Sequence, residues 1–408
     1  MTVRVLHVSA ALAPSLGGPS KAAVELCEAL AARGVDVTLF ATNLDEQGRW
    51  SPFAPPAVAD VQTSRSRWMN GVERCYFDVK WPSRFAFSPD LARAVRQRIG
   101  EFDLVHVHSL YLFTTAAACH HARRAHVPYI VRPHGTLDPY LRRRHAVRKA
   151  VYDTLVQRNQ LDHAAGIHYT SEDELDLVRA LGIRAPGFVS PLGVKIEEFG
   201  ELPPRGTFRA LHPETGDRRL IVFVGRLTQK KGVDILIHAF TQVVEHIPDT
   251  HLVIAGPDDD GLGSTIQRLL HEAELQDRVT MPGMLLGQQK LALLADADVW
   301  VLPSHTENFS LAAVEAMACG LPVVLSDRVN IHRDVVDAGA GLVVPCEAAA
   351  VAAAVSRILD DAELAQSLSG AAKDLVRSRF TWDTAARRLI RVYEGICGGA
   401  TRPQEAAG

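Results

Sequence analysis

Short apolar segments alternate with helical segments along almost the whole chain, and this alternation limits the fold more than any other feature of the sequence. Apolar runs begin near Val3, Leu104 and Tyr129, and the pattern resumes later in the chain. Strands that alternate with helices form parallel sheets covered by helices. Between the two series, residues 201–218 are rich in proline, glycine and charge, which is typical of a linker. The sequence therefore predicts two doubly wound α/β domains.

Size, charge and cysteine usage exclude several classes of protein. The chain has 408 residues, enough for two domains, and its formal net charge of -3 argues against nucleic acid as a partner. Its six cysteines are scattered without paired spacing, which indicates reduced core thiols and a cytoplasmic protein. The first ten residues do not read as a signal peptide, and no apolar run approaches the roughly 18 residues of a membrane-spanning helix. We therefore expect any membrane contact to be peripheral, at the inner face of the cell membrane.

The stretch VWVLPSHTENFSLAAVEAMACGLP carries the strongest local signal for a ligand site. It predicts a buried strand from Val299, a loop, a helix capped by Ser310, and a stop at Gly320. Two carboxylates flank the start of this helix, Glu307 in the loop and Glu315 within an apolar helix. Isolated acidic residues are usually solvated, but a carboxylate among apolar neighbours needs a polar partner. We therefore expect the pair to bind two polar groups of one extended ligand across the helix N-terminus, which also favours anions.

A second cluster of polar residues follows the first strand of the second series. Arg226 ends this strand, and Lys231 lies five residues later with Lys230 beside it. Two cations at a strand-to-helix turn suit a diphosphate, because both can make charge-assisted hydrogen bonds to its oxygens.

The first half of the chain offers weaker candidates. Gly17 and Gly18 lie in a turn between a strand and a helix, where backbone amides can approach a phosphate or sugar, although many such turns are only turns. His134 follows the strand that begins at Tyr129, at the end of a parallel sheet where ligands bind. His106 and His108 are weaker candidates, since single histidines are more often structural.

Glu307, Glu315 and the AMACGLPVV segment resemble the signature of the retaining glycosyltransferases of family 4, which have the GT-B fold. This resemblance implies two Rossmann-like doubly wound domains that face a cleft. The first, residues 1–200, would bind the acceptor, and the second, residues 201–380, would bind the nucleotide-sugar donor. A C-terminal helix at residues 381–400 would cross back to the first domain.

The resemblance also assigns roles to individual residues. Glu307 would bind hydroxyls of the donor sugar, Glu315 the ribose, Arg226 and Lys231 the pyrophosphate, and His134 the sugar near its reacting carbon. The resulting set comprises catalytic His134, Arg226, Lys231 and Glu307, and donor-binding Gly17, Gly18, Gly225, Arg226, Lys231, Met284, Leu285, Glu307, Asn308, Phe309, Ser310, Leu311 and Glu315.

The expected reaction is transfer of a hexosyl group from a nucleoside diphosphate sugar to an acceptor hydroxyl, with retention at the anomeric carbon. The donor would be a UDP-, GDP- or ADP-sugar, and the acceptor a glycan or a lipid-linked sugar in surface polysaccharide biosynthesis. The resemblance implies no catalytic metal, and Asp258, Asp259 and Asp260 are typical turn residues rather than metal ligands. Two alternatives are another GT-B enzyme, such as a sugar-nucleotide epimerase, and a non-catalytic protein that binds nucleotide sugars or glycans.

Two segments of the first half allow more than one interpretation. Residues 141–149 form a basic helix that is either a solvated face or a contact for anionic lipid or a diphosphate-linked acceptor. Residues 43–82 are rich in proline, serine and charge, and form either a long insert or a hairpin.

Overall fold

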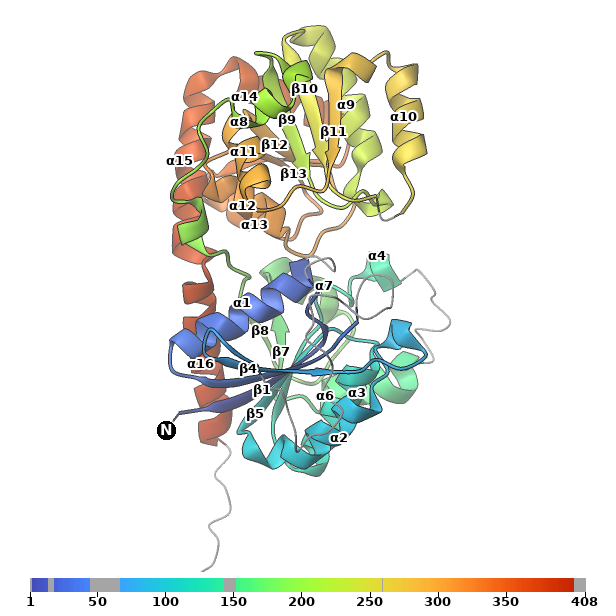
Figure 1. Ribbon diagram of the computed structural model, residues 1–408, viewed down its shortest axis with the longest axis vertical. Coiled ribbons are helices and arrows are strands. Elements are labelled where there is room, and N and C mark those ends of the chain that lie inside the picture. The colour runs from blue at the N-terminus through green and yellow to red at the C-terminus, as the bar shows by residue number, and fades with distance from the viewer. Residues whose placement is uncertain (1, 14–17, 45–66, 143–151, 259, 400–408) are drawn as a thin grey trace, which may run out of the picture. The chain divides into compact units, whose positions relative to one another are not determined.

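The computed structural model describes residues 2–13, 18–44, 67–142, 152–258 and 260–399. The chain divides into two compact units (Figure 1). Unit 1 comprises Met1–Gly193 with Trp382–Gly408, and unit 2 comprises Val194–Thr381. Each unit contains one sheet with helices around it, so the prediction of two α/β domains with parallel sheets is confirmed.

Unit 1 is built on an eight-stranded sheet in the order β3-β4-β2-β1-β5-β6-β7-β8. All neighbouring pairs are parallel except β3 and β4. The strands are β1 Arg4–Ala11, β2 Asp36–Thr42, β3 Arg67–Met69, β4 Val72–Phe77, β5 Leu104–His108, β6 Tyr129–Arg132, β7 Gly166–Tyr169 and β8 Gly187–Val189. The α-helices are α1 Gly18–Ala32, α2 Pro89–Arg98, α3 Phe113–Arg124, α4 Pro139–Arg142, α6 Arg158–Asp162, α7 Glu172–Arg179 and α16 Trp382–Gly399.

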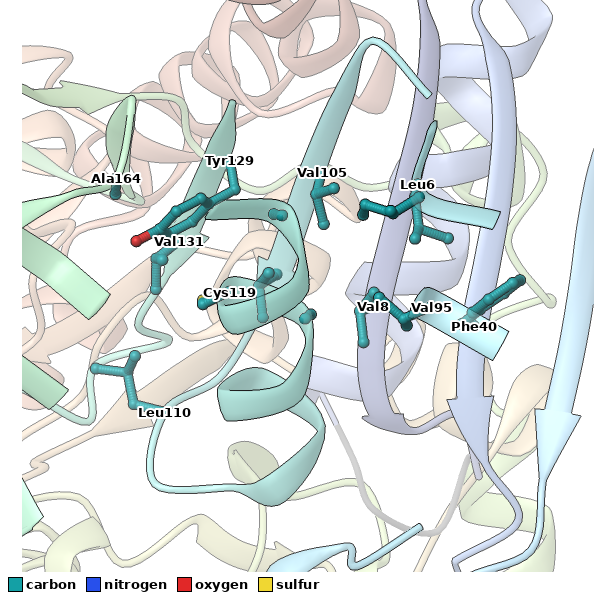
Figure 2. Packing of buried hydrophobic residues seen from close by; sticks show 14 of the residues in the cluster. Leu6, Val8, Phe40, Val95, Val105, Leu110, Cys119, Tyr129, Val131 and Ala164 are labelled. Carbon is teal, nitrogen blue, oxygen red and sulfur yellow. The ribbon is translucent and has the colours of Figure 1, made fainter. Parts of the chain in front are cut away.

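Successive side chains along the strands point to opposite faces of this sheet. On one face, apolar side chains of the strands pack with those of α2 and α3 in a single core; they include Leu6, Val8, Val95, Val105 and Cys119 (Figure 2). Because side chains alternate along a strand, the intervening residues point to the other face, where α1 and α16 pack against each other. The Trp382 indole donates a hydrogen bond to the Glu25 carboxylate (2.8 Å) and thereby ties α16 to α1.

The two ambiguous segments have partly defined structures. Within residues 43–82, β3 and β4 form a hairpin, and β4 extends the sheet by pairing with β2. The hairpin alternative is therefore confirmed for this part. Most of the predicted basic helix at residues 141–149 lies outside the described residues, because only its first two residues belong to α4.

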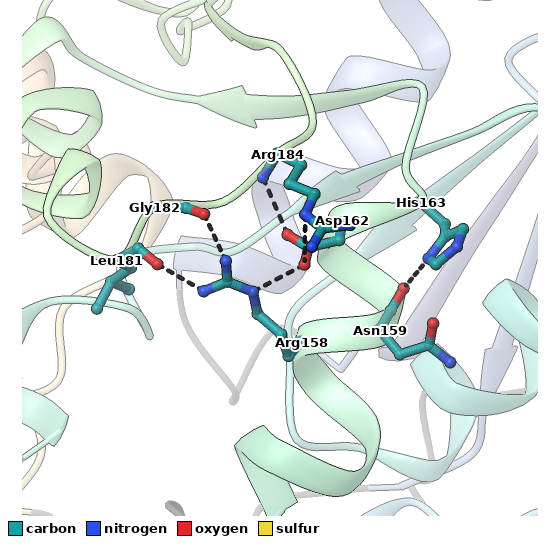
Figure 3. Close-up of polar contacts among 7 residues, drawn as sticks. All are labelled: Arg158, Asn159, Asp162, His163, Leu181, Gly182 and Arg184. Atoms are coloured by element: carbon teal, nitrogen blue, oxygen red, sulfur yellow. Dashed lines mark hydrogen bonds and ion pairs between the residues drawn. The ribbon is translucent and has the colours of Figure 1, made fainter.

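Further along the chain, the Arg158 side chain of α6 fixes the loop between α7 and β8. Its guanidinium donates to the carbonyl oxygens of Leu181 and Gly182 and to the carboxylate of Asp162 (Figure 3). The other oxygen of Asp162 accepts a hydrogen bond from the Arg184 backbone amide (2.9 Å). These contacts anchor the loop that leads into β8, the edge strand of the sheet.

Unit 2 is built on a six-stranded parallel sheet in the order β11-β10-β9-β12-β13-β14. The strands are β9 Arg219–Val224, β10 Thr250–Ala255, β11 Val279–Gly283, β12 Val299–Leu302, β13 Val323–Ser326 and β14 Gly341–Val344. The α-helices are α8 Thr207–Leu211, α9 Val233–His246, α10 Gly263–Glu272, α11 Gly287–Asp296, α12 Leu311–Ala318, α13 His332–Asp337, α14 Ala348–Asp360 and α15 Ala362–Arg379. α9 packs on α14, and α12 packs on α15.

The segment 201–218, which the sequence predicts as a linker, is partly helical and is anchored to unit 2. The buried carboxylate of Asp296, in α11, accepts hydrogen bonds from the backbone amides of Phe208 (2.9 Å) and Arg209 (3.1 Å) at the start of α8. A carboxylate at this position satisfies amides that a short helix leaves without partners. The composition of this segment does not reveal this distant cap, because Asp296 lies 88 residues beyond Phe208 along the chain.

Candidate functional site

The candidate site of unit 2 forms where two neighbouring strands end. β9 pairs with β12 in parallel, so the carboxyl ends of the two strands lie side by side. Gly225 and Arg226 directly follow β9, and a short 3-10 helix, Gln229–Lys231, comes next. The loop that holds Glu307 follows β12. The topology therefore brings together the two clusters that the sequence places more than 70 residues apart.

The two loops are in direct backbone contact. Gly232 has φ +65°, and a Cβ atom there would lie 2.0 Å from the carbonyl oxygen of Pro303. The Lys230 carbonyl accepts hydrogen bonds from the His305 amide (2.7 Å) and the Ser304 hydroxyl (2.8 Å). Only glycine permits this close approach at a positive φ. The lysine pair is thereby fixed against the loop after β12.

Lys231 and Glu307 form a nearly buried ion pair. The Lys231 Nζ atom lies 2.5 Å from Glu307 Oε2, and the two side chains are only 13% and 14% exposed. The Lys230 Nζ atom approaches the same carboxylate oxygen at 3.7 Å. Arg226 also acts electrostatically on both members of the pair. Three cations and one carboxylate leave this cluster with a net positive charge, which suits an anionic ligand.

The pKa values of the pair follow from burial and from the neighbouring charges. Burial alone would raise the pKa of the Glu307 carboxyl, but the Lys231 and Lys230 ammonium groups, with Arg226, lower it to about 2. Burial lowers the pKa of the Lys231 ammonium group, and the Glu307 carboxylate offsets part of this effect. Glu307 is therefore ionised at neutral pH and cannot serve as a proton donor.

The start of α12 has the predicted cap but also an unpredicted backbone strain. The Ser310 hydroxyl accepts a hydrogen bond from the Ala313 amide (3.3 Å), while Ser310 itself has φ +64°. Phe309 is only 2% exposed and packs edge-to-face on Phe380, with 5.4 Å between the ring centroids. The Phe309 side chain therefore belongs to the core, and only its backbone is available to a donor.

Glu315 has a protein partner that sequence reasoning missed. Its carboxylate Oε2 accepts a hydrogen bond from the Lys290 Nζ of α11 at 2.7 Å, and the two side chains are 9% and 18% exposed respectively. A protein side chain therefore already supplies one polar partner for this carboxylate, and its role toward a ligand stays a prediction. Lys290 lies in an ordinary helical stretch, GQQKLALLAD, and only the packing of α11 beside α12 gives it this partner.

Lys290→Met is expected to destabilise unit 2 and to weaken nucleotide binding. The variant leaves a nearly buried carboxylate without its charged partner, at a cost of about 1.5–3 kcal/mol. Thermal melting and nucleotide titration measure the two effects. The exposed neighbour Gln289 offers a matched control, because Gln289→Met adds the same side chain without touching Glu315. Equal melting temperatures for the two variants would contradict the prediction.

The remaining predicted residues of unit 2 lie in or next to loops that follow its strands. Met284 and Leu285 lie between β11 and α11, where Met284 is exposed. Asn308 and Leu311 flank the start of α12. Asp258 caps α10, since its carboxylate accepts hydrogen bonds from the Leu262 (2.6 Å) and Gly263 (2.9 Å) amides. Asp260 accepts one from the Gln229 amide (3.2 Å), and Asp259 lies outside the described residues.

In unit 1, the structure places His134 on a strained turn at the end of β6. His134 has φ +54°, and the following Gly135 has φ +75°. The Gly135 amide donates a hydrogen bond to the buried Glu174 carboxylate (2.9 Å), which also accepts one from the Thr170 amide (2.7 Å). Glu174 therefore anchors the backbone beside His134. Gly18 is the first residue of α1, and Gly17 lies outside the described residues.

Comparison with known proteins identifies the family. A family model described as a glycosyl transferase 4-like domain matches residues 17–193. A second model, described as glycosyl transferases group 1, matches residues 205–375. The chain is also 30% identical over 405 residues to D-inositol 3-phosphate glycosyltransferase of Xylanimonas cellulosilytica, covering 92% of this chain and 91% of that one. The chain belongs to the family 4 type of glycosyltransferases. The resemblance inferred from Glu307 and Glu315 is therefore confirmed.

Other relatives of this glycosyltransferase differ in the sugars and acceptors that their names specify. It is 26% identical to GDP-mannose:cellobiosyl-diphosphopolyprenol alpha-mannosyltransferase of Xanthomonas campestris, over 99% of this chain and all of that one. It is 37% identical to glycogen synthase of Mycobacterium tuberculosis over 205 residues, and it spans about half (48%) of that protein. The structure of Anabaena HepE in complex with UDP-glucose matches with a TM-score of 0.74 and 18% identity, covering 96% and 99% of the two chains. This likeness confirms the GT-B fold.

Proposed function

We propose that this glycosyltransferase moves a hexosyl group from a nucleoside diphosphate sugar to a hydroxyl of a glycan or lipid-linked acceptor, with retention at the anomeric carbon and without a metal. The cluster of Arg226, Lys230, Lys231 and Glu307 carries the proposal. Its net positive charge, held between two strand ends and close to the start of α12, supports binding of the donor diphosphate. The developing charge of the leaving group is the main barrier to such a transfer.

The reaction steps assigned to the chain's own residues are electrostatic. The Lys231 and Arg226 cations would stabilise the departing diphosphate, and Glu307 would bind sugar hydroxyls while holding Lys231 in place. Glu315, oriented by Lys290, would bind the ribose. Because Glu307 is ionised and hydrogen-bonds as an acceptor, it suits hydroxyl binding rather than proton donation. The acceptor proton would pass to the donor phosphate itself.

The acceptor and the cellular location are part of the same proposal. A role in surface polysaccharide biosynthesis is supported by the Xanthomonas campestris relative, whose name specifies a diphosphopolyprenol-linked acceptor. None of the helices that the structure describes is long and apolar enough to cross a bilayer. A cytoplasmic protein that contacts the inner face of the membrane peripherally would meet such acceptors, and the basic residues of 141–149 would favour anionic lipid.

A thermal melt with UDP, GDP and ADP, in the presence of a chelator, tests the donor site directly. One nucleotide is expected to stabilise the protein, because a ligand at a hundredfold its dissociation constant adds about 2.7 kcal/mol. The corresponding nucleotide sugars are then compared in the same way. The Xanthomonas campestris relative is named for GDP-mannose, and the HepE structure contains UDP-glucose. UDP and GDP are therefore the leading candidates for the donor nucleotide.

The Lys231→Met variant is the control for this melt. It should fold but lose the stabilisation by the nucleotide, because it lacks a cation that would contact the diphosphate. If no nucleotide stabilises the wild-type protein, or if stabilisation requires added Mg²⁺, the proposed metal-independent donor site is wrong.

A further inference from the structure

Five histidines of unit 1 gather on the face of the sheet that α1 and α16 cover. They are His7 on β1, His106 and His108 on β5, His168 on β7 and His134 just after β6. Four of them are at most 1% exposed, whereas His134 is partly exposed. His7 lies opposite His106 in the sheet register. The group therefore forms a buried layer of imidazoles with one member at its edge.

These imidazoles are neutral at physiological pH. Burial, reinforced by the Arg132 cation, lowers the pKa of His7 to about 3 and places the pKa values of His108 and His134 well below the usual value. A neutral imidazole carries one N–H group and one bare nitrogen, so each ring donates at one nitrogen and accepts at the other. Hydrogen bonds between the rings therefore link their tautomers.

One branch of the layer shows how a single protein group fixes a series of tautomers. His168 Nε2 lies 2.8 Å from the Ser190 carbonyl oxygen, which only accepts, so His168 carries its hydrogen on Nε2. Its bare Nδ1 must accept from His106 Nε2 (3.3 Å). His106 Nδ1 must in turn accept from the Tyr393 hydroxyl (2.6 Å). Every tautomer in this branch follows from one carbonyl group.

The other branch joins His7, His108 and His134. His7 Nδ1 lies 3.0 Å from His108 Nε2, and His108 Nδ1 lies 3.3 Å from His134 Nε2. Among the described residues, the outer nitrogen His7 Nε2 has no hydrogen-bond partner. Two arrangements are chemically consistent, and they differ in whether His134 offers a donor or an acceptor at its outer nitrogen, Nδ1.

The surroundings of His7 select one arrangement. A buried N–H group without a partner is costlier and rarer than a bare acceptor. The nearby Arg132 guanidinium is fully buried and has no hydrogen-bond partner among the described residues, and such a cation favours a lone pair over an N–H dipole. His7 therefore carries its hydrogen on Nδ1 and donates to His108. His108 then donates to His134, which keeps its own hydrogen on Nδ1.

We propose that His7 and His108 are positioning residues that hold His134 in the Nδ1–H tautomer, so that His134 donates a hydrogen bond from Nδ1 to an oxygen of the donor sugar. The second half of this statement rests on the proposed function, whereas the tautomer does not. The fixed backbone at His134 and Gly135 keeps the Nδ1–H group of His134 in a constant place. A sugar oxygen accepts such a bond without any change in protonation.

Nitrogen-15 NMR of histidine-labelled protein, without ligand, tests the tautomer. Long-range proton–nitrogen correlations distinguish a protonated from a bare ring nitrogen, and a His134→Ala sample identifies the signals of His134. The expected result is a protonated Nδ1 and a bare Nε2. The opposite tautomer in the wild-type protein would overturn the proposal, whatever the variants do.

Three substitutions test the positioning role. His108→Leu removes the donor to His134, so no hydrogen bond selects its tautomer any longer and Nε2–H should be populated beside Nδ1–H. His106→Leu is the matched control, because it removes a buried histidine from the same strand and face but leaves this branch intact. His108→Gln should restore the wild-type tautomer, since its amide can donate to His134 Nε2. An unchanged His134 tautomer in His108→Leu would also overturn the proposal.

Ligand binding separates this proposal from the proposed function. His108→Leu should weaken binding of the nucleotide sugar by about three- to tenfold, the effect of one lost hydrogen bond, and leave binding of the bare nucleotide unchanged. If the tautomer is as expected but His134→Ala binds the nucleotide sugar like wild type, His134 does not contact the sugar and the second half of the proposal is wrong. If no nucleotide binds at all, the proposed function fails while the tautomer assignment stands.

Discussion

Lys231→Met is expected to reduce transfer by about 10²- to 10³-fold, the typical effect of removing one group that stabilises a developing negative charge. Lys231 is nearly buried beside Glu307, so its charge acts in surroundings where water screens it little. Methionine keeps most of the side-chain volume but carries no charge. The effect is measured as release of the nucleoside diphosphate. The substrate in this assay is the nucleotide sugar that stabilises the protein most.

Lys230 provides the matched control for this substitution. It is the adjacent residue of the same 3-10 helix, but its Nζ atom is 3.7 Å from Glu307 rather than 2.5 Å, and its side chain is 27% exposed. Lys230→Met should therefore reduce the rate by less than about tenfold, as expected of a more solvent-screened charge. A larger loss in Lys230→Met than in Lys231→Met would show that the wrong lysine has been assigned to the diphosphate.

Glu307→Gln is expected to abolish most of the transfer and also to destabilise the protein by about 3–5 kcal/mol, because it leaves the nearly buried Lys231 charge without its partner. For a domain of this size each kcal/mol lowers the melting temperature by roughly 2–4 °C. The ion pair with Lys231, which the sequence does not reveal, is the reason to expect this loss of stability. Thermal and chemical unfolding of both proteins measure the difference.

The stability difference between Glu307→Gln and wild type should depend on pH in a defined direction. The folded-state pKa of Glu307 is lowered to about 2, and that of an unfolded glutamate is about 4.3. The ionised carboxylate therefore contributes stability that is present above the unfolded value and is lost as the pH falls towards 2. We expect the advantage of the wild type to be constant near neutral pH and to shrink below about pH 4.3.

The double variant Lys231→Met/Glu307→Gln separates the ion pair from other effects of the mutations. It should be more stable than Glu307→Gln alone, because neither charge remains buried without a partner. Equal instability of the single and double variants would mean that the loss comes from packing rather than from the unpaired lysine. Transfer should stay low in both variants.

Much of this fold follows from local patterns in the sequence. Buried parallel strands are short continuous apolar runs, so segments such as Val299–Leu302 can be predicted as strands from their composition. The Ser310 cap is equally local, because its hydroxyl bonds an amide three residues later. The family assignment rests on the spacing of Glu307 and Glu315, which comparison with known proteins confirmed. The individual roles of the site residues stay predictions.

The sequence by itself determined most of the strands and helices, the parallel arrangement of the main strands and the residue types available at the strand ends. Only the tertiary structure decided which charged groups are partners: Lys231 with Glu307, Lys290 with Glu315, and Asp296 with the start of α8. The physical reason is the separation along the sequence of the residues that interact. Hydrogen bonds within helices, caps and turns join residues close in sequence, whereas the burial and pairing of a charge depend on side chains that only folding brings within a few ångströms.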